Sequence, residues 1–211
     1  MKILGITGGI ACGKSFVTGL FARWGARTAS ADADARTVVL PGSATLEAVL
    51  AAFPDARSRE GRLDRSRLAA RIFGDADARA KLEAVMHPAI FVEMRETIES
   101  ARSATDAPLL AYEVPLLFEK DRAPMFDATL AVVCAPETQA ARLQERERTA
   151  GRPALSPEQI AERLSAQLPN DEKARRADYV IRTDGTLADT ESQARAVWVA
   201  VVGSEPPGTA V

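Results

Sequence analysis

Short apolar runs along this chain alternate with longer stretches in which apolar residues recur at the spacing of a helix face. The runs lack a strict apolar–polar alternation, which is typical of strands covered on both faces of a parallel sheet. Such strands are predicted at residues 3–7, 27–30, 108–112, 128–134 and 178–182, of which 27–30 is the weakest. Because helical patterns separate them, the chain is predicted to have an α/β fold with a five-stranded parallel sheet.

The second and third predicted strands are separated by residues 35–106, a charge-rich segment that is too long for one crossover helix. We expect a mostly helical insertion at the carboxyl edge of the sheet and interpret it as a substrate-binding subdomain. Its helices are predicted at 44–53, 66–73, 75–86 and 88–102. Leu82, Val85 and Met86 share one helix face and are expected in its core.

A second helical stretch, residues 137–175, is rich in arginine at positions 142, 146, 148, 152 and 163. Two interpretations stay open. A run of charges is ordinarily a helix face in water. Alternatively, the segment is a lid whose arginines close over the phosphates of a nucleotide and exclude water. Arg142 and Arg146 share one helix face, and residues 149–153 would form the flexible tip.

The sequence GGIACGKS at residues 8–15 joins the first predicted strand to a predicted helix over 16–24. The form G-x-x-x-x-G-K-S between a strand and a helix is that of a phosphate-binding loop. Its N–H groups and the helix N-terminus attract an anion. Lys14 can reach the β- and γ-phosphates, and the Ser15 hydroxyl can bind Mg²⁺. The predicted nucleotide-binding residues are Gly8, Gly9, Ile10, Ala11, Cys12, Gly13, Lys14, Ser15 and Phe16.

Three acidic residues, Asp32, Asp34 and Glu113, follow the second and third predicted strands. Ligands of an open parallel sheet bind beyond the carboxyl ends of its strands, so we expect these acids on the side of the phosphate loop. Asp32 is the candidate that orients or deprotonates the attacking hydroxyl, although it could instead cap the following helix. Glu113 is a candidate for holding Mg²⁺ or its waters, with a surface carboxylate as the alternative. Glu119 is expected to be structural.

The chain is 46% apolar and 27% charged with a net charge of −2, as in ordinary soluble proteins. No basic surplus supports nucleic-acid binding, and no apolar run approaches the roughly 20 residues of a membrane span. Cys12 and Cys134 have no metal-ligand spacing. Because the first strand begins without a preceding signal peptide, we expect reduced thiols and a cytoplasmic protein. Residues 203–211 are predicted to be a disordered tail.

These motifs together resemble one family, the dephospho-CoA kinases. The resemblance spans residues 3 to about 190. It rests most on VPLLFE at 114–119 and on His-Pro at 87–88, because phosphate loops occur in many other kinases. Further matching segments are 5–15, 32–36, 63–65, 82–83, 142–146, 163–167, 172–173 and 177–181.

The resemblance implies a P-loop kinase that uses ATP and Mg²⁺ to phosphorylate the ribose 3′-hydroxyl of dephospho-CoA, giving coenzyme A. Asp32, rather than Asp34, would be the general base, and the helical insertion would bind CoA. The implied catalytic residues are Asp32, Lys14, Arg142 and Arg146, the two arginines lying on the lid. The implied substrate-side residues are Asp32, Arg36, Arg65, His87 and Glu113. Ser15 would bind Mg²⁺, with Asp32 and Glu113 acting through water.

Taken without the resemblance, His87 is more simply a helix cap or a hydrogen-bonding partner in the core. The resemblance implies a small-molecule substrate as the partner, with no nucleic acid and no membrane. We expect a monomer or a weak homo-oligomer.

Three positions depart from the family's pattern. Ser30 stands where many members carry another acid, so a two-carboxylate metal site is not expected there. Cys12 replaces a usual serine, which matters little where backbone N–H groups do the binding. Thr183 replaces an asparagine, which leaves the adenine contacts near 182–185 open.

Two other functions remain as alternatives. A kinase for another small acceptor, such as a nucleoside monophosphate, would carry the same phosphate loop. A nucleotide-dependent switch would ordinarily carry an N-K-x-D guanine signature, whereas residues 170–173 read N-D-E-K.

Overall fold

The structure is a computed structural model that describes residues 1–207. Its backbone divides into two compact units. The sheet unit comprises residues 1–29 and the chain from residue 101 onward, and the helical unit comprises residues 30–100. The helical unit begins and ends slightly before the insertion expected at 35–106.

Five strands form one sheet in the order β2-β3-β1-β4-β5, with β1 at its centre. The pairings of β1 with β3 and β4, and of β4 with β5, are parallel. The fold class and all five predicted strands are therefore confirmed, and the weak run at 27–30 forms the edge strand beside β3. The strands are β1 (Lys2–Gly8), β2 (Arg27–Ser30), β3 (Leu109–Glu113), β4 (Ala128–Val133) and β5 (Tyr179–Arg182).

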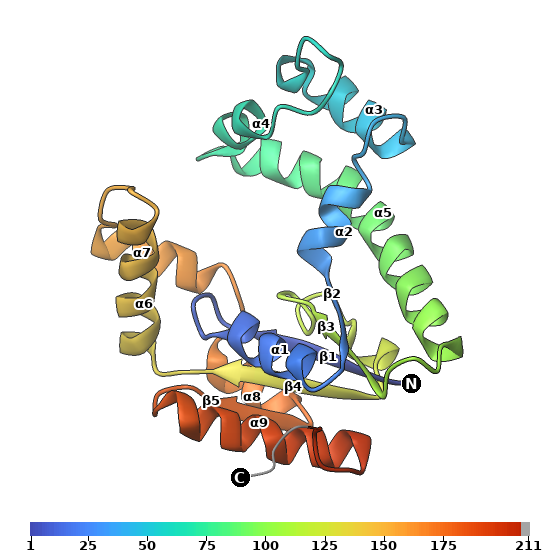
Figure 1. Ribbon diagram of the computed structural model, residues 1–211. Helices are drawn as coiled ribbons and strands as arrows, with labels where there is room; N and C mark the ends of the chain where they lie inside the picture. Colours follow the sequence, from blue (N-terminus) through green and yellow to red (C-terminus); the bar gives the residue numbers. More distant parts are fainter. Residues whose placement is uncertain (208–211) are drawn as a thin grey trace. The chain divides into compact units, whose positions relative to one another are not determined.

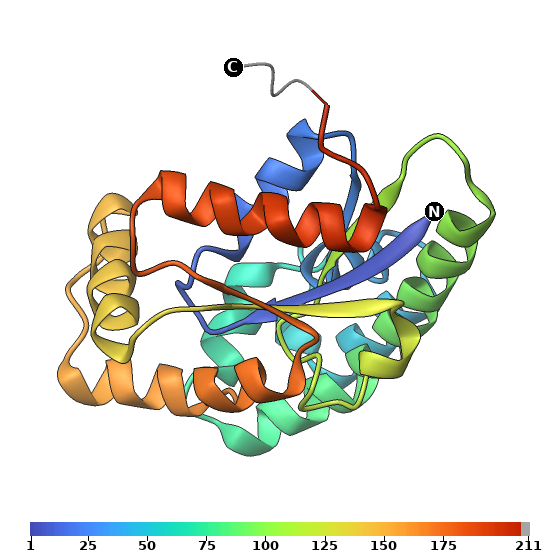
Figure 2. The same cartoon turned by 90° about the horizontal axis from the view of Figure 1, so that it is seen from below.

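Helices cover the sheet on both faces, as the lack of alternation in the strands predicts. Figure 2 shows β4 between α9 on one side and α8 on the other. The α-helices of the sheet unit are α1 (Lys14–Arg23), α6 (Pro136–Thr149), α7 (Pro157–Ser165), α8 (Asn170–Arg176) and α9 (Leu187–Val202). A short 3₁₀ turn, η2 (Ala123–Met125), precedes β4.

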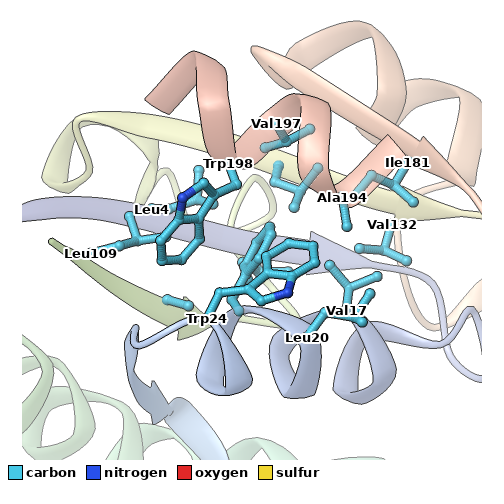
Figure 3. Close-up of a cluster of buried hydrophobic side chains, with 14 residues drawn as sticks. Leu4, Val17, Leu20, Trp24, Leu109, Val132, Ile181, Ala194, Val197 and Trp198 are labelled. Atoms are coloured by element: carbon cyan, nitrogen blue, oxygen red, sulfur yellow. The ribbon is translucent and has the colours of Figure 1, made fainter. Parts of the chain in front are cut away.

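A large buried cluster lies between α1, α9 and the sheet (Figure 3). Trp24, which caps the end of α1, and Trp198 of α9 meet edge to face, with ring centroids 5.8 Å apart, and Phe21 packs against both rings. Leu20 on the same face of α1 is fully buried. This apolar contact fixes α1 against the sheet and thereby holds the loop from which α1 begins.

The helical unit has its own core, made by the apolar faces of short helices. Val49 and Leu50 of α3 are buried against Leu68 of α4, and Leu82 and Val85 of α5 pack on this cluster, as predicted. The elements are α2 (Ala31–Thr37), α3 (Ala44–Ala52), η1 (Pro54–Ala56), α4 (Arg65–Ile72) and α5 (Ala76–Ser103) (Figure 1).

The prediction of two helices, at 75–86 and 88–102, is wrong, because α5 runs without a break through Pro88. Proline removes one N–H donor and crowds the carbonyl one turn earlier, at a cost of about 3 kcal/mol. The residues on both sides of Pro88 belong to one apolar stripe, since Met86 and Ile90 pack against the same cluster. Burial of that stripe outweighs the single lost hydrogen bond.

The last helix ends at Gly203, whose φ of +84° suits glycine at a helix end. Within the segment predicted as a tail, Glu205 lies 3.5 Å from Arg195 and Pro206 is buried. Residues 208–211 lie outside the described residues. None of the helices within residues 1–207 is long and apolar enough to cross a membrane.

The Trp198 ring predicts a difference between two substitutions. Trp198→Ala should lower the free energy of unfolding by about 3–5 kcal/mol, since it empties a fully buried site. Trp198→Phe should cost only about 1–2 kcal/mol, because a ring remains and an indole N–H without a partner among the described residues is removed. Urea denaturation measures both, and equal losses would contradict this account.

Candidate active site

The phosphate loop leaves β1 through backbone conformations that favour glycine. At Gly8, φ is +151° and a Cβ would lie 2.0 Å from the carbonyl oxygen of Val132. Gly13 caps α1 in the left-handed conformation, with φ of +84°. Ala11 has φ of +60° without the freedom of glycine, a form of strain that collects at functional sites. The expected strand, loop and helix are thus all present.

Lys14 lies inside the curl of this loop. Its Nζ donates to the carbonyl oxygens of Gly8 and Gly9, at 2.9 and 3.0 Å. Ser15, the next residue, is exposed in the first turn of α1. The loop therefore gathers an ammonium group, a hydroxyl and the N-terminal N–H groups of a helix at the carboxyl end of β1, which is a site for a polyanion.

Glu113 is brought to the same edge of the sheet by strand register. It is the last residue of β3 and stands opposite Ile6 of β1, two residues before the phosphate loop begins at Gly8. The Val114 N–H continues this pairing by donating to the Ile6 oxygen at 2.8 Å. The structure thus places Glu113 and the phosphate loop at neighbouring strand ends, as predicted.

The segment after β3 is held by a buried ion pair. The Lys173 side chain is fully buried, and its Nζ lies 2.8 Å from Glu119 and donates to the Pro115 oxygen at 2.7 Å. The hydroxyl of Thr7 donates to the same oxygen at 3.1 Å. These bonds connect α8 and β1 to the turn that follows Glu113. Glu119 has the structural role expected of it.

The pKa of Glu119 reflects opposing influences. Burial raises it, but hydrogen bonds from Lys173 and from the Leu168 N–H lower it further, so the pKa of this carboxyl lies below its usual value. The ionised form is therefore favoured in the folded protein. The pair stabilises the fold above the ordinary pKa of the carboxyl and loses this effect as the pH falls through the lowered pKa.

The arginine-rich segment consists of α6 and α7, which lie side by side (Figure 1), followed by α8. Glu147 of α6 is buried and bonds Arg152 of the connecting loop and Arg163 of α7. Hydrogen bonds from these two arginines lower the pKa of Glu147 to about 2. The Gln144 amide makes two hydrogen bonds with the backbone of Leu155, at 2.6 and 2.9 Å. The loop that contains the tip expected to be flexible is thus bonded to α6.

The arginines of this segment have different partners. Arg148 pairs with Glu145 on the same helix. Arg142 donates to the hydroxyl of Thr183 at 2.8 Å and to its carbonyl oxygen at 2.5 Å. The Thr183 hydroxyl in turn donates to the Cys12 oxygen at 3.0 Å, so Arg142 is connected to the phosphate loop through Thr183. Arg146, one turn further along α6, is exposed.

The two free cysteines meet behind the phosphate loop. The Cys134 thiol, at the end of β4, donates to the Cys12 sulfur at 3.2 Å, and both residues are buried. This bond lowers the pKa of Cys12, with help from Asn170 and Lys14, and raises the pKa of Cys134. No sequence pattern indicated this contact, because Cys12 lies in the phosphate loop and Cys134 lies 122 residues further along the chain.

The remaining predicted site residues lie in the helical unit. Asp32 is exposed in the first turn of α2, and the cap of that helix is Ser30, whose hydroxyl accepts from the Ala33 N–H at 3.1 Å. The capping interpretation of Asp32 is therefore wrong. Asp34, by contrast, is buried.

Arg36 and Arg65 are exposed at the end of α2 and the start of α4. His87 is half-buried, and its Nε2 lies 4.0 Å from a carboxylate oxygen of Glu83 one turn earlier. The idea that His87 caps a helix is wrong, because α5 passes through it. Among the predicted site residues of the helical unit, Asp32 is thus an exposed carboxylate and Arg36 and Arg65 are exposed cations.

Comparison with known proteins decides the family. The dephospho-CoA kinase family model matches residues 2–189. The chain is 43% identical over 192 residues to a dephospho-CoA kinase of Thermosynechococcus vestitus, covering 90% of each chain. It is 39% identical over 206 residues to that of Novosphingobium aromaticivorans, covering 98% of each.

The chain belongs to the dephospho-CoA kinase family. The expected enzyme class is thereby confirmed, and the alternative of a kinase for another acceptor is not favoured. A crystal structure of a Thermus thermophilus protein is similar with a TM-score of 0.74 and 36% identity, covering 95% of this chain and 97% of that one. Dephospho-CoA kinase from Campylobacter jejuni has a TM-score of 0.67 at 23% identity, covering 96% and 98%, and shows the shared fold.

Sequence reasoning missed several residues that shape this family site. Gln139, Asn170 and Thr183 bond the phosphate loop, Lys173 carries a buried charge bonded to the turn after Glu113, and Glu147 carries a buried charge in α6. Gln139 and Asn170 belong to no motif that the sequence analysis identified, because their partners in the phosphate loop lie 129 and 158 residues away in the chain. The one sequence feature that could have indicated Gln139 is its position on the predicted arginine-rich helix, three residues before Arg142.

The pair of Lys173 and Glu119 predicts a pH-dependent loss of stability. Lys173→Met should lower the free energy of unfolding by about 3–5 kcal/mol near neutral pH, because it leaves a poorly solvated carboxylate without its cation. The deficit relative to the wild type should shrink as the pH falls below the ordinary carboxyl pKa of 4.5, where Glu119 of the variant is protonated.

Urea denaturation across this pH range measures the deficit. The double variant Lys173→Met with Glu119→Leu is the control, since it removes both charges and should be more stable than Lys173→Met alone. A deficit that stays constant with pH, together with an unrescued double variant, would show that packing rather than charge accounts for the loss.

Proposed function

We propose that the phosphate loop holds the β- and γ-phosphates of ATP while the γ-phosphoryl group passes in line to the ribose 3′-hydroxyl of dephospho-CoA. The observation that supports this most is the position of the Lys14 ammonium group inside a loop of curled backbone at the start of α1. In such transfer the protein mainly positions the groups and stabilises charge. Lys14 would exchange its two carbonyl partners for phosphate oxygens, which bind it more strongly.

The oxygen-bearing side chains beside the loop are suitable ligands for Mg²⁺. They are the exposed hydroxyl of Ser15 and the carboxylate of Glu113, both oxygen ligands, which suit an ion that keeps several waters and phosphate oxygens. Within residues 1–207 no three His, Cys, Asp or Glu side chains are grouped to hold a metal by themselves. Ser15 would bind the ion directly and Glu113 through water, with Asp32 as a further water-mediated partner. When bound, Mg²⁺ would neutralise charge on the phosphates.

Asp32 would accept or orient the proton of the attacking hydroxyl. Its carboxylate is exposed and is not engaged in capping α2, because Ser30 does this. An acid directly after an edge strand of a parallel sheet is suited to meet a substrate beyond the strand ends. Asp34, which is buried, is not suited to contact a substrate.

The acceptor would be held by the helical unit. Arg36 and Arg65 are exposed cations that suit the diphosphate of dephospho-CoA, and His87 could add a further donor. Arg142 and Arg146 would act from the lid on the phosphate side. Arg142 is held toward the loop through Thr183, and exposed Arg146 can move with α6. Both would stabilise charge during transfer while water is excluded.

The reaction itself is tested by a panel of acceptors. Purified protein with ATP and Mg²⁺ should add one phosphoryl group to dephospho-CoA, detected by product mass, and should act on nucleoside monophosphates far more slowly. Lys14→Met should lower the rate by about 10²-fold or more, because it removes the loop's charge. A preference for a nucleoside monophosphate over dephospho-CoA would overturn the proposed acceptor.

The role of Asp32 is tested by Asp32→Asn. Turnover should fall about 10²- to 10⁴-fold, because the amide cannot take the hydroxyl proton. Nucleotide affinity should stay near that of the wild type, since the phosphate loop is untouched. Asp55→Asn, at another exposed acid of the helical unit, is the matched control and should keep full turnover. Equal turnover in Asp32→Asn would remove Asp32 from the mechanism.

A further inference from the structure

Two side-chain amides, of Gln139 and Asn170, contact the phosphate loop from other elements of the fold. We call this pair of amides the wall behind the loop. Gln139 of α6 is buried, and its Nε2 donates to the Ile10 carbonyl oxygen at 2.8 Å. Asn170, at the start of α8, donates from Nδ2 to the Gln139 Oε1 at 2.9 Å and to the Cys134 oxygen at 2.8 Å. The bonds thus run from the end of β4 through two amides to the loop.

The wall fits tightly against the loop. A Cβ placed on Gly9 would lie 2.4 Å from both the Gln139 Nε2 and the Asn170 Oδ1. Asn170 also donates toward the Cys12 sulfur at 3.3 Å. Glycine at this position therefore leaves room for the two amides. The packing leaves Gln139 little freedom to turn away from Ile10.

The bond to Ile10 has a consequence on the opposite side of the loop. In a planar trans peptide the C=O and the next N–H point in opposite directions. Gln139 holds the Ile10 oxygen toward the wall, so the Ala11 N–H is turned away from the wall. Thr183 holds the Cys12 oxygen in the same manner, which orients the Gly13 N–H. Ala11, at φ of +60°, would otherwise favour another conformation.

The same helix face carries the arginines proposed for the lid. Gln139, Arg142 and Arg146 are three and then four residues apart, so they lie along one side of α6. Gln139 is thus the point at which the arginine-bearing helix is bonded directly to the backbone of the phosphate loop. A movement of α6 would change the support of the Ile10 peptide.

We propose that Gln139 is a positioning residue that connects α6 to the phosphate loop and orients the Ala11 N–H toward the phosphates of the nucleotide. Asn170 holds Gln139 in the orientation that makes it a donor to Ile10. The proposal rests on nucleotide binding at the loop, and it adds a side chain that touches neither substrate.

The test uses Gln139→Met, which keeps the length of the side chain and removes its hydrogen bonds. Inorganic tripolyphosphate probes the loop alone, and its dissociation constant is measured by calorimetry without metal. We expect this constant, and the KM for ATP, to rise about 10- to 100-fold, as for the loss of a buried hydrogen bond that leaves a carbonyl unpaired. The KM for dephospho-CoA should stay within about twofold, because the acceptor does not use this loop.

The matched control is Gln193→Met. The side-chain amide of Gln193 also connects a helix to backbone, through two hydrogen bonds with the N–H and the carbonyl oxygen of Arg182. Neither of these bonds involves the phosphate loop. It should keep the wild-type affinity for tripolyphosphate. If neither the wild type nor this control binds tripolyphosphate, the proposed nucleotide site is wrong. If both bind it and Gln139→Met binds it more weakly, the loss of affinity is due to Gln139 alone.

A second variant separates positioning from packing. Gln139→Glu places a carboxylate against the Ile10 oxygen, and when protonated this group becomes a donor again. Burial beside a carbonyl raises the pKa of such a carboxyl, so the donor form increases as the pH falls from about 8 to about 5.5. Measured relative to the wild type at each pH, tripolyphosphate affinity should recover toward acid in Gln139→Glu and stay low in Gln139→Met.

Two outcomes would overturn the proposal. One is wild-type tripolyphosphate affinity in folded Gln139→Met. The other is an equal loss of affinity for ATP and for dephospho-CoA in both variants, with no recovery at acid pH, which would mean that Gln139 only fills space. Urea denaturation of each variant fixes the folded fraction used in these comparisons.

Discussion

The close approach of β1 and β4 at the start of the phosphate loop is the constraint on which the site depends. Gly8 passes so near the Val132 oxygen that no side chain fits, and the chain can then turn out of the sheet into the loop. The tryptophan cluster beneath α1 fixes where the loop must end. Between these two fixed points, the peptide groups curl around Lys14. Anion binding here is a property of backbone direction rather than of any one side chain.

Most polar groups around this loop are engaged on its outer side. The amides of Gln139 and Asn170, the hydroxyl of Thr183 and the thiols of two cysteines bond loop atoms or one another. Carbonyl oxygens that bond outward leave N–H groups facing inward. The loop is thus ordered when the protein folds, before a nucleotide binds. Binding therefore requires less free energy for ordering the loop.

The arginines of the segment formed by α6 and α7 have different surroundings in the structure. Buried Glu147 binds Arg163 of α7 and Arg152 of the connecting loop, so these pairs hold α7 and the loop to α6, whereas Glu145 binds Arg148 within α6. Arg142 is directed to Thr183 and Arg146 stays exposed. Three arginines thus pair with glutamates, whereas the lid interpretation of Arg142 and Arg146 stays a prediction. A simple count of arginines could not separate them, because the separation depends on where two glutamates lie.

The apolar pattern located all five strands, because a strand covered on both faces must be apolar throughout. The strand–loop–helix order and the G-x-x-x-x-G-K-S spacing located the phosphate loop for an equally local reason. The start of α2 was misjudged: Ser30 and Asp32 are both good capping residues, and only backbone geometry chooses between them. Pro88 was also misjudged, because the burial that keeps α5 whole comes from residues in α3 and α4.

The sequence by itself determined the fold class, the phosphate loop and the family, since these are written in short-range spacing and in residue types that only certain backbones tolerate. Tertiary structure alone decided which polar side chains support the loop. Gln139, Asn170 and Thr183 are distant from residues 8–15 in the chain and become its neighbours only when β4, α6 and α8 assemble around β1. A hydrogen bond between such residues depends on distances that the folded chain sets and that no local pattern records.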